Sequence, residues 1–374
     1  MRFRTRPAAI LHALALLLLM ARAAAAVPDG PYVLDSAAGW QAWSVQVSGD
    51  AASKQARAVG PGDVLTVPAV GSVPAFTVRL RGSAAIAPDE VSTPKGVPLF
   101  VVADTHGEYE ILVAMLRAHK IIGPDLQWRF ARGHLAVLGD VFDRGPNHLE
   151  ILWLLYQLEA QAAQAGGGVH VVLGNHEVLA LQGDARYLHP KYTETARVLG
   201  VANYAELFAP GSVLGQWLRT RPAMLKLDDS LCLHAGVSRA LLDSRLTLGD
   251  INATVRSVLN DEPGQGAMAE LVMGSLGPLW YRGYFPEQTG FPTATPDDLR
   301  LALDTFGVRR ILIGHTIVPT VTPLYGGKVI AVQVYPKRDE AGHTSFAGLM
   351  RRKGEWLQAG PDGRLRRLGE ARPR

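Results

Sequence analysis

Asp, His and Asn residues follow the ends of apolar runs at five places in the chain. These places are ADTHG (103–107), GDVFDRG (139–145), GNHE (174–177), LHAG (233–236) and IGHT (313–316). A single acid beside glycine at the end of a strand is usually part of a solvated turn. In a sheet with parallel strands, however, the carboxyl ends of neighbouring strands meet at one crevice, where ligands bind. We therefore expect the five segments to converge on one site.

The side chains of these segments are suited to binding divalent metal ions. Carboxylate and amide oxygens and imidazole nitrogens, without thiolate, favour manganese, iron or zinc. The predicted metal ligands are Asp104, His106, Asp140, Asn175, His234 and His315. Asp104 and His106 are expected to hold one ion, and the last three ligands the other. Asp140 is expected to bridge the pair at about 3.5 to 4 Å. We thus expect two divalent cations as cofactors, manganese first, with iron or zinc as alternatives.

The residues beside these ligands favour hydrolysis of phosphate esters. Two ions at that separation activate a bridging water as hydroxide for in-line attack at phosphorus. Arg144 carries a planar guanidinium, which pairs bidentately with phosphate oxygens. His176 lies next to Asn175 and is expected to protonate the leaving oxygen, while Asp143 holds its ring in the required tautomer. The sequence therefore predicts a metal-dependent phosphomonoesterase with His176, Asp143 and Arg144 in the catalytic site.

The elements that position these residues alternate strand and helix. From Val97 on, apolar strands are followed by glycine-bearing turns and amphipathic helices, as in VPLFVVADTHG before EYEILVAMLRAHKII. Further strands are predicted in MLKLDD, SLCLHAG, RRILIGHT and KVIAVQVY, with hairpin turns at residues 228–230 and 326–327. The predicted fold class is α/β, a sandwich of β-sheets flanked by helices, with parallel strands where these units cross over.

The chain divides into five segments on composition. Residues 1–26 are interpreted as a signal peptide and 27–95 as a small β-rich module, because short β-branched runs there alternate with Gly, Pro and Asp. Residues 96–340 are the predicted catalytic domain, and 184–221 within it a helical cap or insertion. Residues 341–374 are expected to form C-terminal strands and a basic tail. No repeat of fixed period is present.

The N-terminal leader predicts export. Arginines precede an apolar core from Ala8 to Met20, and a run of alanines follows, so we expect cleavage after Ala26 and no stable membrane anchor afterwards. The mature protein would be periplasmic or secreted. Cys232 is the only cysteine, which rules out an intramolecular disulfide. The net charge of +4 is concentrated in the leader and the tail, without an organised basic stripe, so no nucleic-acid partner is expected.

Four of the motifs resemble those of a known family. GDVFDRG, GNHE, HAG and GHT, in this order between Val97 and Tyr335, are similar to the motifs of the calcineurin-like metallophosphoesterases, in the phosphoprotein-phosphatase branch. The exported leader, the short C-terminal end and PLWYRGYF (278–285) resemble the bacterial Shewanella-like protein phosphatases. The resemblance implies a phosphoprotein or phosphopeptide substrate with a bias to phosphotyrosine. The chain departs from the motifs at Ala103, where the family usually has glycine.

The resemblance also implies how substrate is bound. Arg282 in PLWYRGYF would be a second phosphate-binding arginine and part of the catalytic site. The alternative is that its stem only packs among Trp280, Tyr281 and Tyr284. A flat cleft for a phenyl ring is expected to use Tyr281, Tyr284 or Tyr187. The predicted substrate-binding residues are Arg144, Asn175, Arg282 and Tyr281.

The sequence also bears on three other functions. A cysteine-dependent phosphatase is rejected, because one residue too many separates Cys232 from Arg239 for a loop around one phosphate. A hydrolase of dinucleoside polyphosphates, of the diadenosine tetraphosphate type, shares the motifs and stays open. A non-catalytic metal-stabilised binding module, using residues 27–95 to dock on a partner, also stays open.

Overall fold

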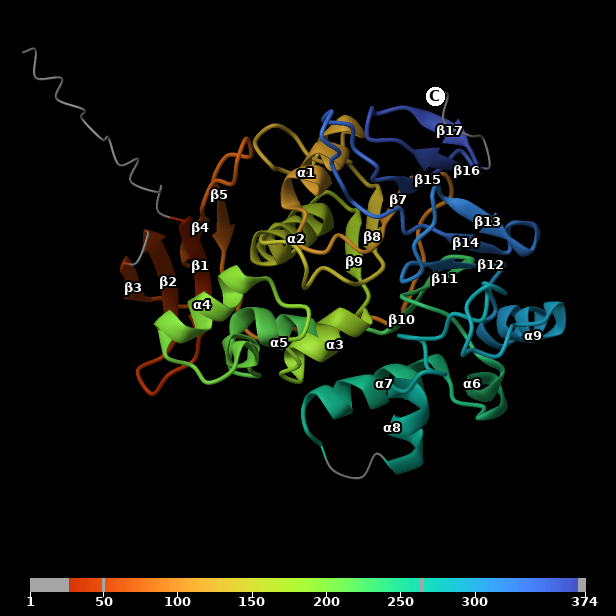
Figure 1. The fold of residues 1–374 in the computed structure, drawn as a ribbon. Helices are drawn as coiled ribbons and strands as arrows, with labels where there is room; N and C mark the ends of the chain where they lie inside the picture. Colours follow the sequence, from red (N-terminus) through yellow and green to blue (C-terminus); the bar gives the residue numbers. More distant parts are fainter. Residues whose placement is uncertain (1–26, 49–50, 263–265, 369–374) are drawn as a thin grey trace, which may run out of the picture.

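Two six-stranded sheets form the centre of the computed structural model, which describes residues 27–48, 51–262 and 266–368 (Figure 1). The first sheet contains, in spatial order, β17 (Leu365–Arg367), β16 (Glu355–Ala359), β15 (Gly348–Arg352), β7 (Leu99–Val102), β8 (His134–Val137) and β9 (Gly168–Val171). The second contains β13 (Thr322–Leu324), β14 (Val329–Ala331), β12 (Arg310–Ile313), β11 (Ser230–Leu233), β10 (Met224–Leu227) and β6 (Glu90–Val91). The predicted signal peptide, residues 1–26, lies outside the described residues.

Strands β7, β8 and β9 are parallel neighbours. Helices α1 (Tyr109–Ala118) and α2 (His148–Gln164) connect them, as crossovers between parallel strands require. Every residue of β7 and β8 is buried, which is why both read as continuous apolar runs in the sequence. Together with the second sheet, these units confirm the predicted α/β sandwich flanked by helices.

The second sheet mixes parallel and antiparallel pairs. Strands β11 and β12 are parallel neighbours, as are β12 and β14. Strands β10 and β11 form a hairpin, in which Asp228 takes a left-handed conformation (φ 56°) at the turn. Strands β13 and β14 form another, closed by the short helix η2 (Tyr325–Gly327). Both turns fall where the sequence predicts them.

The remaining helices surround the two sheets, and residues 184–221 are helical in part. They are α3 (Asn175–Leu181), α4 (Pro190–Leu199), η1 (Tyr204–Phe208), α5 (Val213–Arg219), α6 (Arg239–Asp243), α7 (Leu248–Leu259), α8 (Gly266–Met273) and α9 (Pro296–Phe306). Whether residues 184–221 act as a cap stays a prediction. Among the described residues, no helix combines the length and apolarity needed to cross a membrane.

The N-terminal residues form a separate antiparallel sheet and a hairpin. The sheet consists of β1 (Val27–Leu34), β2 (Gln41–Ser48) and β3 (Ala51–Ala58), and the hairpin of β4 (Val64–Val67) and β5 (Phe76–Arg79). Tyr32 is buried against Tyr204 and Phe208, so this sheet packs on the helical part of the core. Strand β6, which lies within 27–95, pairs instead with β10 of the central sheet.

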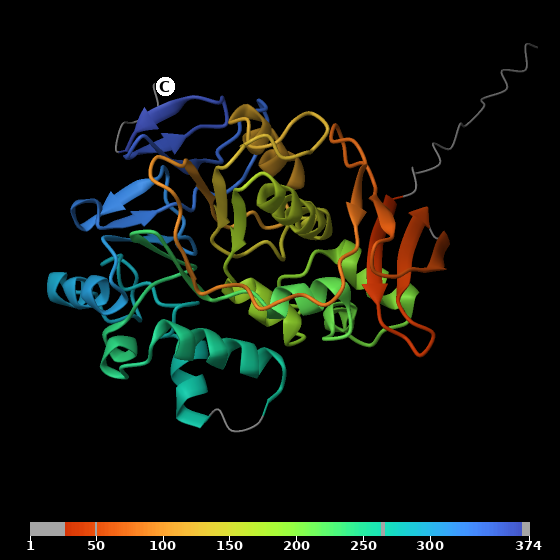
Figure 2. The ribbon, with the colours of Figure 1, turned by 180° about the vertical axis from the view of Figure 1, so that it is seen from behind.

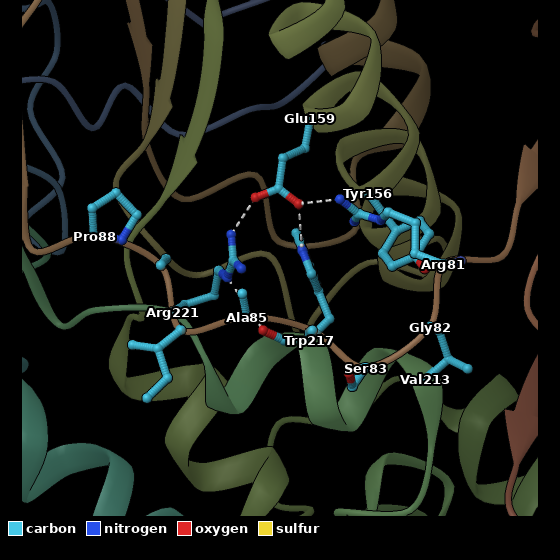
Figure 3. A pocket seen from close by; sticks show the side chains of 13 residues that line it. Arg81, Gly82, Ser83, Ala85, Pro88, Tyr156, Glu159, Val213, Trp217 and Arg221 are labelled. Atoms are coloured by element: carbon cyan, nitrogen blue, oxygen red, sulfur yellow. Dashed lines mark hydrogen bonds and ion pairs between the residues drawn. The ribbon is translucent and has the colours of Figure 1, made fainter.

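A linker connects β5 to β6 across the back of the molecule (Figure 2). Glu159 of α2 holds it by ion pairs with Arg81 of the linker, at 2.7 Å, and with Arg221, while Trp217 Nε1 donates to the same carboxylate (Figure 3). The Arg81 guanidinium also lies 3.8 Å from the centre of the Tyr156 ring. One acid shared by two arginines thus fixes the path of the linker on the core.

Candidate active site

The five polar segments follow β7, β8, β9, β11 and β12, and their side chains meet where the two sheets face each other. Two hydrogen bonds join the sheets at this edge. The His315 backbone N–H donates to the Asp104 carboxylate at 3.1 and 3.2 Å, and His234 Nδ1 lies 2.7 Å from Leu138 O. The structure therefore brings the strand ends together, as the sequence predicts.

Several of the converging residues have left-handed backbone conformations. The φ angles are 45° at Asp104, 41° at His106, 55° at Asp140, 69° at Asp143 and 59° at His315. Asp and His enter this region more readily than most residues other than glycine, although at a cost in conformational energy. The tight turns aim each side chain back over the strand ends. At Gly174 a Cβ would lie 2.2 Å from Asp140 Oδ1, so only glycine allows this approach.

The histidine tautomers are set by backbone carbonyls. His106 Nδ1 lies 3.0 Å from Phe142 O, and a carbonyl can only accept, so Nδ1 carries the proton. The same argument applies to His234 and Leu138 O. The Nε2 atom of each ring is left with a lone pair facing the site. Both rings are more than nine-tenths buried, yet His106 Nε2 and His315 Nε2 have no hydrogen-bond partner among the described residues. This pattern is typical of metal-ligating histidines.

The cluster of acceptors requires a positive charge at its centre. His234 Nε2 lies 2.9 Å from Asn175 Oδ1 and 3.2 Å from Asp140 Oδ2. Burial opposes a charge on the His234 ring, yet the carboxylates of Asp140 and Asp104 outweigh burial and raise its pKa to about 9. The buried carboxylates thus favour a positive charge at this position. A divalent ion satisfies the same demand while leaving the ring neutral.

Two groups of residues have the spacing of metal ligands. They are His106, Asp140 and His176, and Asp140, His234 and His315, with the ligand atoms of each group within 4.8 Å of one another. Asp140 belongs to both, as expected of a bridging ligand. Asp104 lies next to these groups, since it accepts a hydrogen bond from the His315 backbone N–H, and Asn175 lies next to them because its Oδ1 contacts His234 Nε2. The residues present therefore fit two divalent ions by number, chemistry and proximity.

His176 and Asp143 form a buried pair next to the cluster. His176 Nδ1 lies 2.6 Å from Asp143 Oδ2, and the His176 backbone N–H donates to Asp140 Oδ1 at 3.0 Å. Burial favours the neutral ring, but the charges of Asp140 and Asp143 prevail and raise the pKa of His176. Nδ1 donates to the carboxylate, so Nε2 is the atom available to exchange a proton in the site.

Glu177 is a site residue that the sequence reasoning missed. Its side chain is fully buried and accepts four backbone hydrogen bonds, from Gly174, Asp140, Val141 and Phe142, at 2.7 to 3.2 Å. One carboxylate therefore ties the turn after β8 to the start of α3. The signal lies in GNHE, since a Glu at the third position of a helix often bonds back to the residue before the helix.

A cavity of about 330 Å³ opens over the cluster. Arg144 and Arg282 line it, together with Asp104, Asp140, Asn175, His176, Tyr187, Trp280, Gln288, His315, Thr316, Ile317 and Gln333. Arg282 Nη1 donates to His315 O at 2.9 Å and to Thr316 Oγ1 at 3.1 Å. The Arg144 guanidinium lies 5.7 Å from the Tyr335 ring centre. Both predicted phosphate-binding arginines thus lie at the same cavity.

Tyr281 is not at this cavity, contrary to the expectation that it binds substrate. Its side chain is buried, and its hydroxyl donates to Pro292 O at 2.6 Å. Its ring packs edge-to-face against Tyr284 and Phe291, so burial of the aromatic ring directs it into the core. The neighbouring Trp280 lines the cavity instead, with its ring perpendicular to that of His315 at 5.9 Å between ring centres. Tyr187 is the one aromatic named from the sequence for this role that does line the cavity.

Cys232 lies within β11 and is completely buried. Burial raises the pKa of its thiol to about 12, which leaves it protonated and unreactive. Arg239 lies at the surface, where it pairs with Asp243 and Asp298. The structure thus gives a thiol mechanism no exposed nucleophile.

Comparisons with known proteins agree with this geometry. Residues 97–319 match the family model of the calcineurin-like phosphoesterases. The crystal structure of the cold-active protein-tyrosine phosphatase of a psychrophilic Shewanella aligns with a TM-score of 0.78 and 32% identity, over 91% of this chain and 99% of that one. Shewanella-like protein phosphatase 1 of Plasmodium berghei is 29% identical over 226 residues, and the matched region covers 59% of this chain and 62% of that protein.

A more distant similarity concerns the alternative left open above. The symmetrical bis(5'-nucleosyl)-tetraphosphatase of Wigglesworthia glossinidia brevipalpis is 30% identical over 142 residues, which are 37% of this chain and 44% of that enzyme. The family match covers more than half of the chain and contains all five strand-end segments. The chain therefore belongs to the calcineurin-like phosphoesterases and is a metallophosphoesterase.

Proposed function

We propose that this protein is a phosphomonoesterase dependent on two divalent ions, which dephosphorylates phosphoproteins with a preference for phosphotyrosine. The observation that carries the proposal is the position of Arg144 and Arg282 at one cavity with the cluster of Asp and His ligands. Two guanidiniums can grip the oxygens of a terminal phosphate, while the cluster lies at its phosphorus. The name of the Shewanella relative, a protein-tyrosine phosphatase, supports the substrate class.

We assign the metal ions to the residues already predicted. Asp104, His106 and Asp140 would hold one ion, and Asp140, Asn175, His234 and His315 the other, with His176 nearby. Manganese is the ion we propose first, with iron or zinc as alternatives, because the ligands are oxygens and imidazole nitrogens. When bound, such ions supply an acidified water and neutralise charge on the phosphoryl oxygens.

The proton required by the leaving group comes from His176 in this proposal. Its Nδ1 is held by Asp143 at 2.6 Å, which orients the ring, and the raised pKa keeps a proton available on Nε2. The leaving tyrosinate or serinate oxygen takes that proton as its bond to phosphorus breaks. Arg282 is positioned by His315 O and Thr316 Oγ1, so its remaining donors are free for phosphate.

An apolar rim at the cavity supports an aromatic phosphoester. Tyr187, Ile317 and Trp280 line the cavity. The Tyr187 and Ile317 side chains are 46% and 57% exposed, and the Trp280 ring is partly buried. A phenyl ring that enters between these side chains would bury apolar surface, which a serine methylene cannot do to the same extent. The phosphate would then reach the two arginines at the base.

The test compares four substrates with manganese-loaded, leader-free protein: p-nitrophenyl phosphate, a phosphotyrosine peptide, the same peptide with phosphoserine, and diadenosine tetraphosphate. The proposal predicts turnover of the first two, at least tenfold faster than of the phosphoserine peptide. Asp140→Asn should remove this turnover, and Asp297→Asn, a change at a 76% exposed carboxylate, should not. Cleavage of diadenosine tetraphosphate alone would favour the tetraphosphatase-like alternative, which the Wigglesworthia relative supports. If none of the four substrates is turned over, the result would favour the hypothesis of a non-catalytic metal-stabilised binding module.

We also propose that the protein acts outside the cytoplasm, in a periplasm or as a secreted protein. The charged, apolar and small-residue parts of the leader support this. Fractionation of cells expressing the full chain, with mass spectrometry of the mature N-terminus, should find a chain starting at Val27 in the exported fraction. A full-length chain in the cytoplasm would contradict the proposal.

A further inference from the structure

A second polar cavity, of about 550 Å³, lies at the opposite ends of the strands that carry the metal ligands. We call it the rear pocket; residues 93–97, 228–229, 309–310, 351, 353–354 and 356 line it. Arg310 is the first residue of β12, whereas His315 follows its last residue. At about 3.3 Å per residue of strand, roughly 16 Å separate the two. The rear pocket is therefore distinct from the active-site cavity.

Positive charge accumulates in the rear pocket. Five cationic side chains and two carboxylates line it, which leaves an excess of three positive charges. Arg351 uses both carboxylates, with Asp228 at 2.6 Å and Asp229 at 3.9 Å. The other cations form no ion pair with any residue in the described ranges; they are Lys95, Arg309, Arg310 and Lys353. Charges of one sign gathered in a concave site attract counter-ions of the opposite sign.

The Trp356 ring holds two of these cations in place. The Arg310 guanidinium carbon lies 5.0 Å from its centre, and that of Arg351 lies 5.8 Å away. The ring attracts each cation, so the Arg310 guanidinium is held there without an ion pair to any described residue. Arg310 Nε is buried without a hydrogen-bond partner. Burial lowers the pKa of Arg310; the charge of Asp229 opposes this shift, whereas the charges of Arg309 and Arg351 add to it.

We propose that the rear pocket binds a small molecule with two or more oxyanion groups, such as phosphoryl or carboxylate groups. A volume of about 550 Å³ is in the range of ligand pockets for organic molecules and exceeds what a single oxyanion fills. The cations come from three separate chain segments, so a ligand with several anionic groups can contact more of them than one ion can. Guanidinium groups pair bidentately with phosphate and carboxylate alike. This site does not depend on the substrate proposed for the front cavity.

The experiment is calorimetric titration of the manganese-loaded protein with three probes: a naphthalene trisulfonate, a benzene tricarboxylate and sulfate. Neither multivalent probe is a phosphatase substrate, and together they separate phosphoryl-like from carboxylate ligands. We expect one equivalent of at least one multivalent probe to bind at least tenfold more tightly than sulfate. Lys95→Gln/Lys353→Gln, in which both changes fall on exposed side chains, should weaken that binding at least tenfold and leave p-nitrophenyl phosphate hydrolysis unchanged.

Two controls make the result decisive. Arg300→Gln/Arg364→Gln removes the same charge from side chains that are 66% and 80% exposed, away from both cavities, and should bind the probe like the wild type. Arg144→Gln/Arg282→Gln alters the front cavity and should also retain probe binding. Equal weakening by the Arg300/Arg364 pair would reduce the effect to overall charge. Loss of binding only with the Arg144/Arg282 pair would place the probe in the front cavity. Either result, or no binding of the multivalent probes, overturns the proposal.

Discussion

Glu177→Gln tests whether one buried carboxylate holds the active-site turns together. Oε2 accepts the Gly174 and Asp140 amides at 2.7 and 2.8 Å, and Oε1 accepts those of Val141 and Phe142 at 2.7 and 3.2 Å. Glutamine has the same shape, but its NH₂ group can only donate. Two of the four backbone donors therefore lose their acceptor, whichever way the amide turns.

The magnitude follows from the cost of a buried donor without an acceptor. Each one costs about 1 to 3 kcal/mol, so we expect the variant to lose about 2 to 6 kcal/mol of unfolding free energy. Natural domains have about 5 to 15 kcal/mol in total, so this loss is large. In either orientation of the amide, at least one backbone donor of residues 140–142, the turn that carries Asp140, loses its acceptor. We therefore expect manganese affinity to fall by about 10- to 100-fold as the turn shifts.

The assay is urea unfolding in the presence of a chelator, followed by circular dichroism, with a separate manganese titration of hydrolysis. The chelator keeps loss of metal from being counted as loss of intrinsic stability. Glu194→Gln is the matched control, because Glu194 lies on the surface of α4, where its ion-pair partner among the described residues is Arg197. It should cost less than about 0.5 kcal/mol. A Glu177→Gln protein that unfolds within about 1 kcal/mol of the wild type, with the same manganese requirement, would refute this account of the carboxylate.

Three further predictions follow from the same geometry. His176→Gln should lower kcat by about 10² to 10⁴-fold on phenyl phosphate and by much less on p-nitrophenyl phosphate, because a nitrophenolate leaves without a proton; equal losses would argue against general acid catalysis. Glu159→Gln should cost roughly 3 kcal/mol near neutral pH, measured by urea unfolding. Despite its burial, the charges of Arg221 and Arg81 lower the pKa of Glu159, so its contribution is present above the unfolded pKa and is lost as pH falls through the folded pKa. The difference from wild type should therefore shrink from about pH 6 to about pH 3, and a constant difference would contradict the ion-pair explanation. Cys232, with its pKa raised to about 12 by burial, should resist iodoacetamide in the native protein, and mass spectrometry showing rapid labelling would contradict the burial of β11.

The strand-end segments were predictable because turn chemistry and strand periodicity are local properties of the sequence. Asp140 and His315 each follow an apolar run, and parallel pairing gathers such ends at one edge of each sheet, while the packing of the two sheets brings the two edges together. Whether an aromatic ring in a loop points into the core or toward solvent depends on packing with distant residues, so the local sequence does not determine it. Tyr281 and Trp280 are adjacent, and only packing against Phe291 decides that Tyr281 faces the core while Trp280 faces the cavity.

Two other features depended on tertiary structure in the same way. For Glu177 the sequence carries a signal only for the bond to Gly174 at the start of α3, whereas its three bonds to residues 140–142 come from a turn more than thirty residues away. The assignment of β6 to the central sheet also depends on a long-range pair with β10, which no short window of sequence contains. Long-range pairing of two-residue strands has too little hydrophobic pattern to be detected.

The left-handed conformations at the active site have an evolutionary consequence. Asp104, Asp140 and Asp143 each adopt a backbone shape in which glycine is at ease and an acid is strained. A gene copy released from selection for hydrolysis could exchange such an acid for glycine by a single-base change and relieve both that strain and the repulsion between buried carboxylates. Inactivated descendants of this protein should thus drift toward glycine-rich turns while the sheets persist, so that loss of catalysis and gain of stability arrive together.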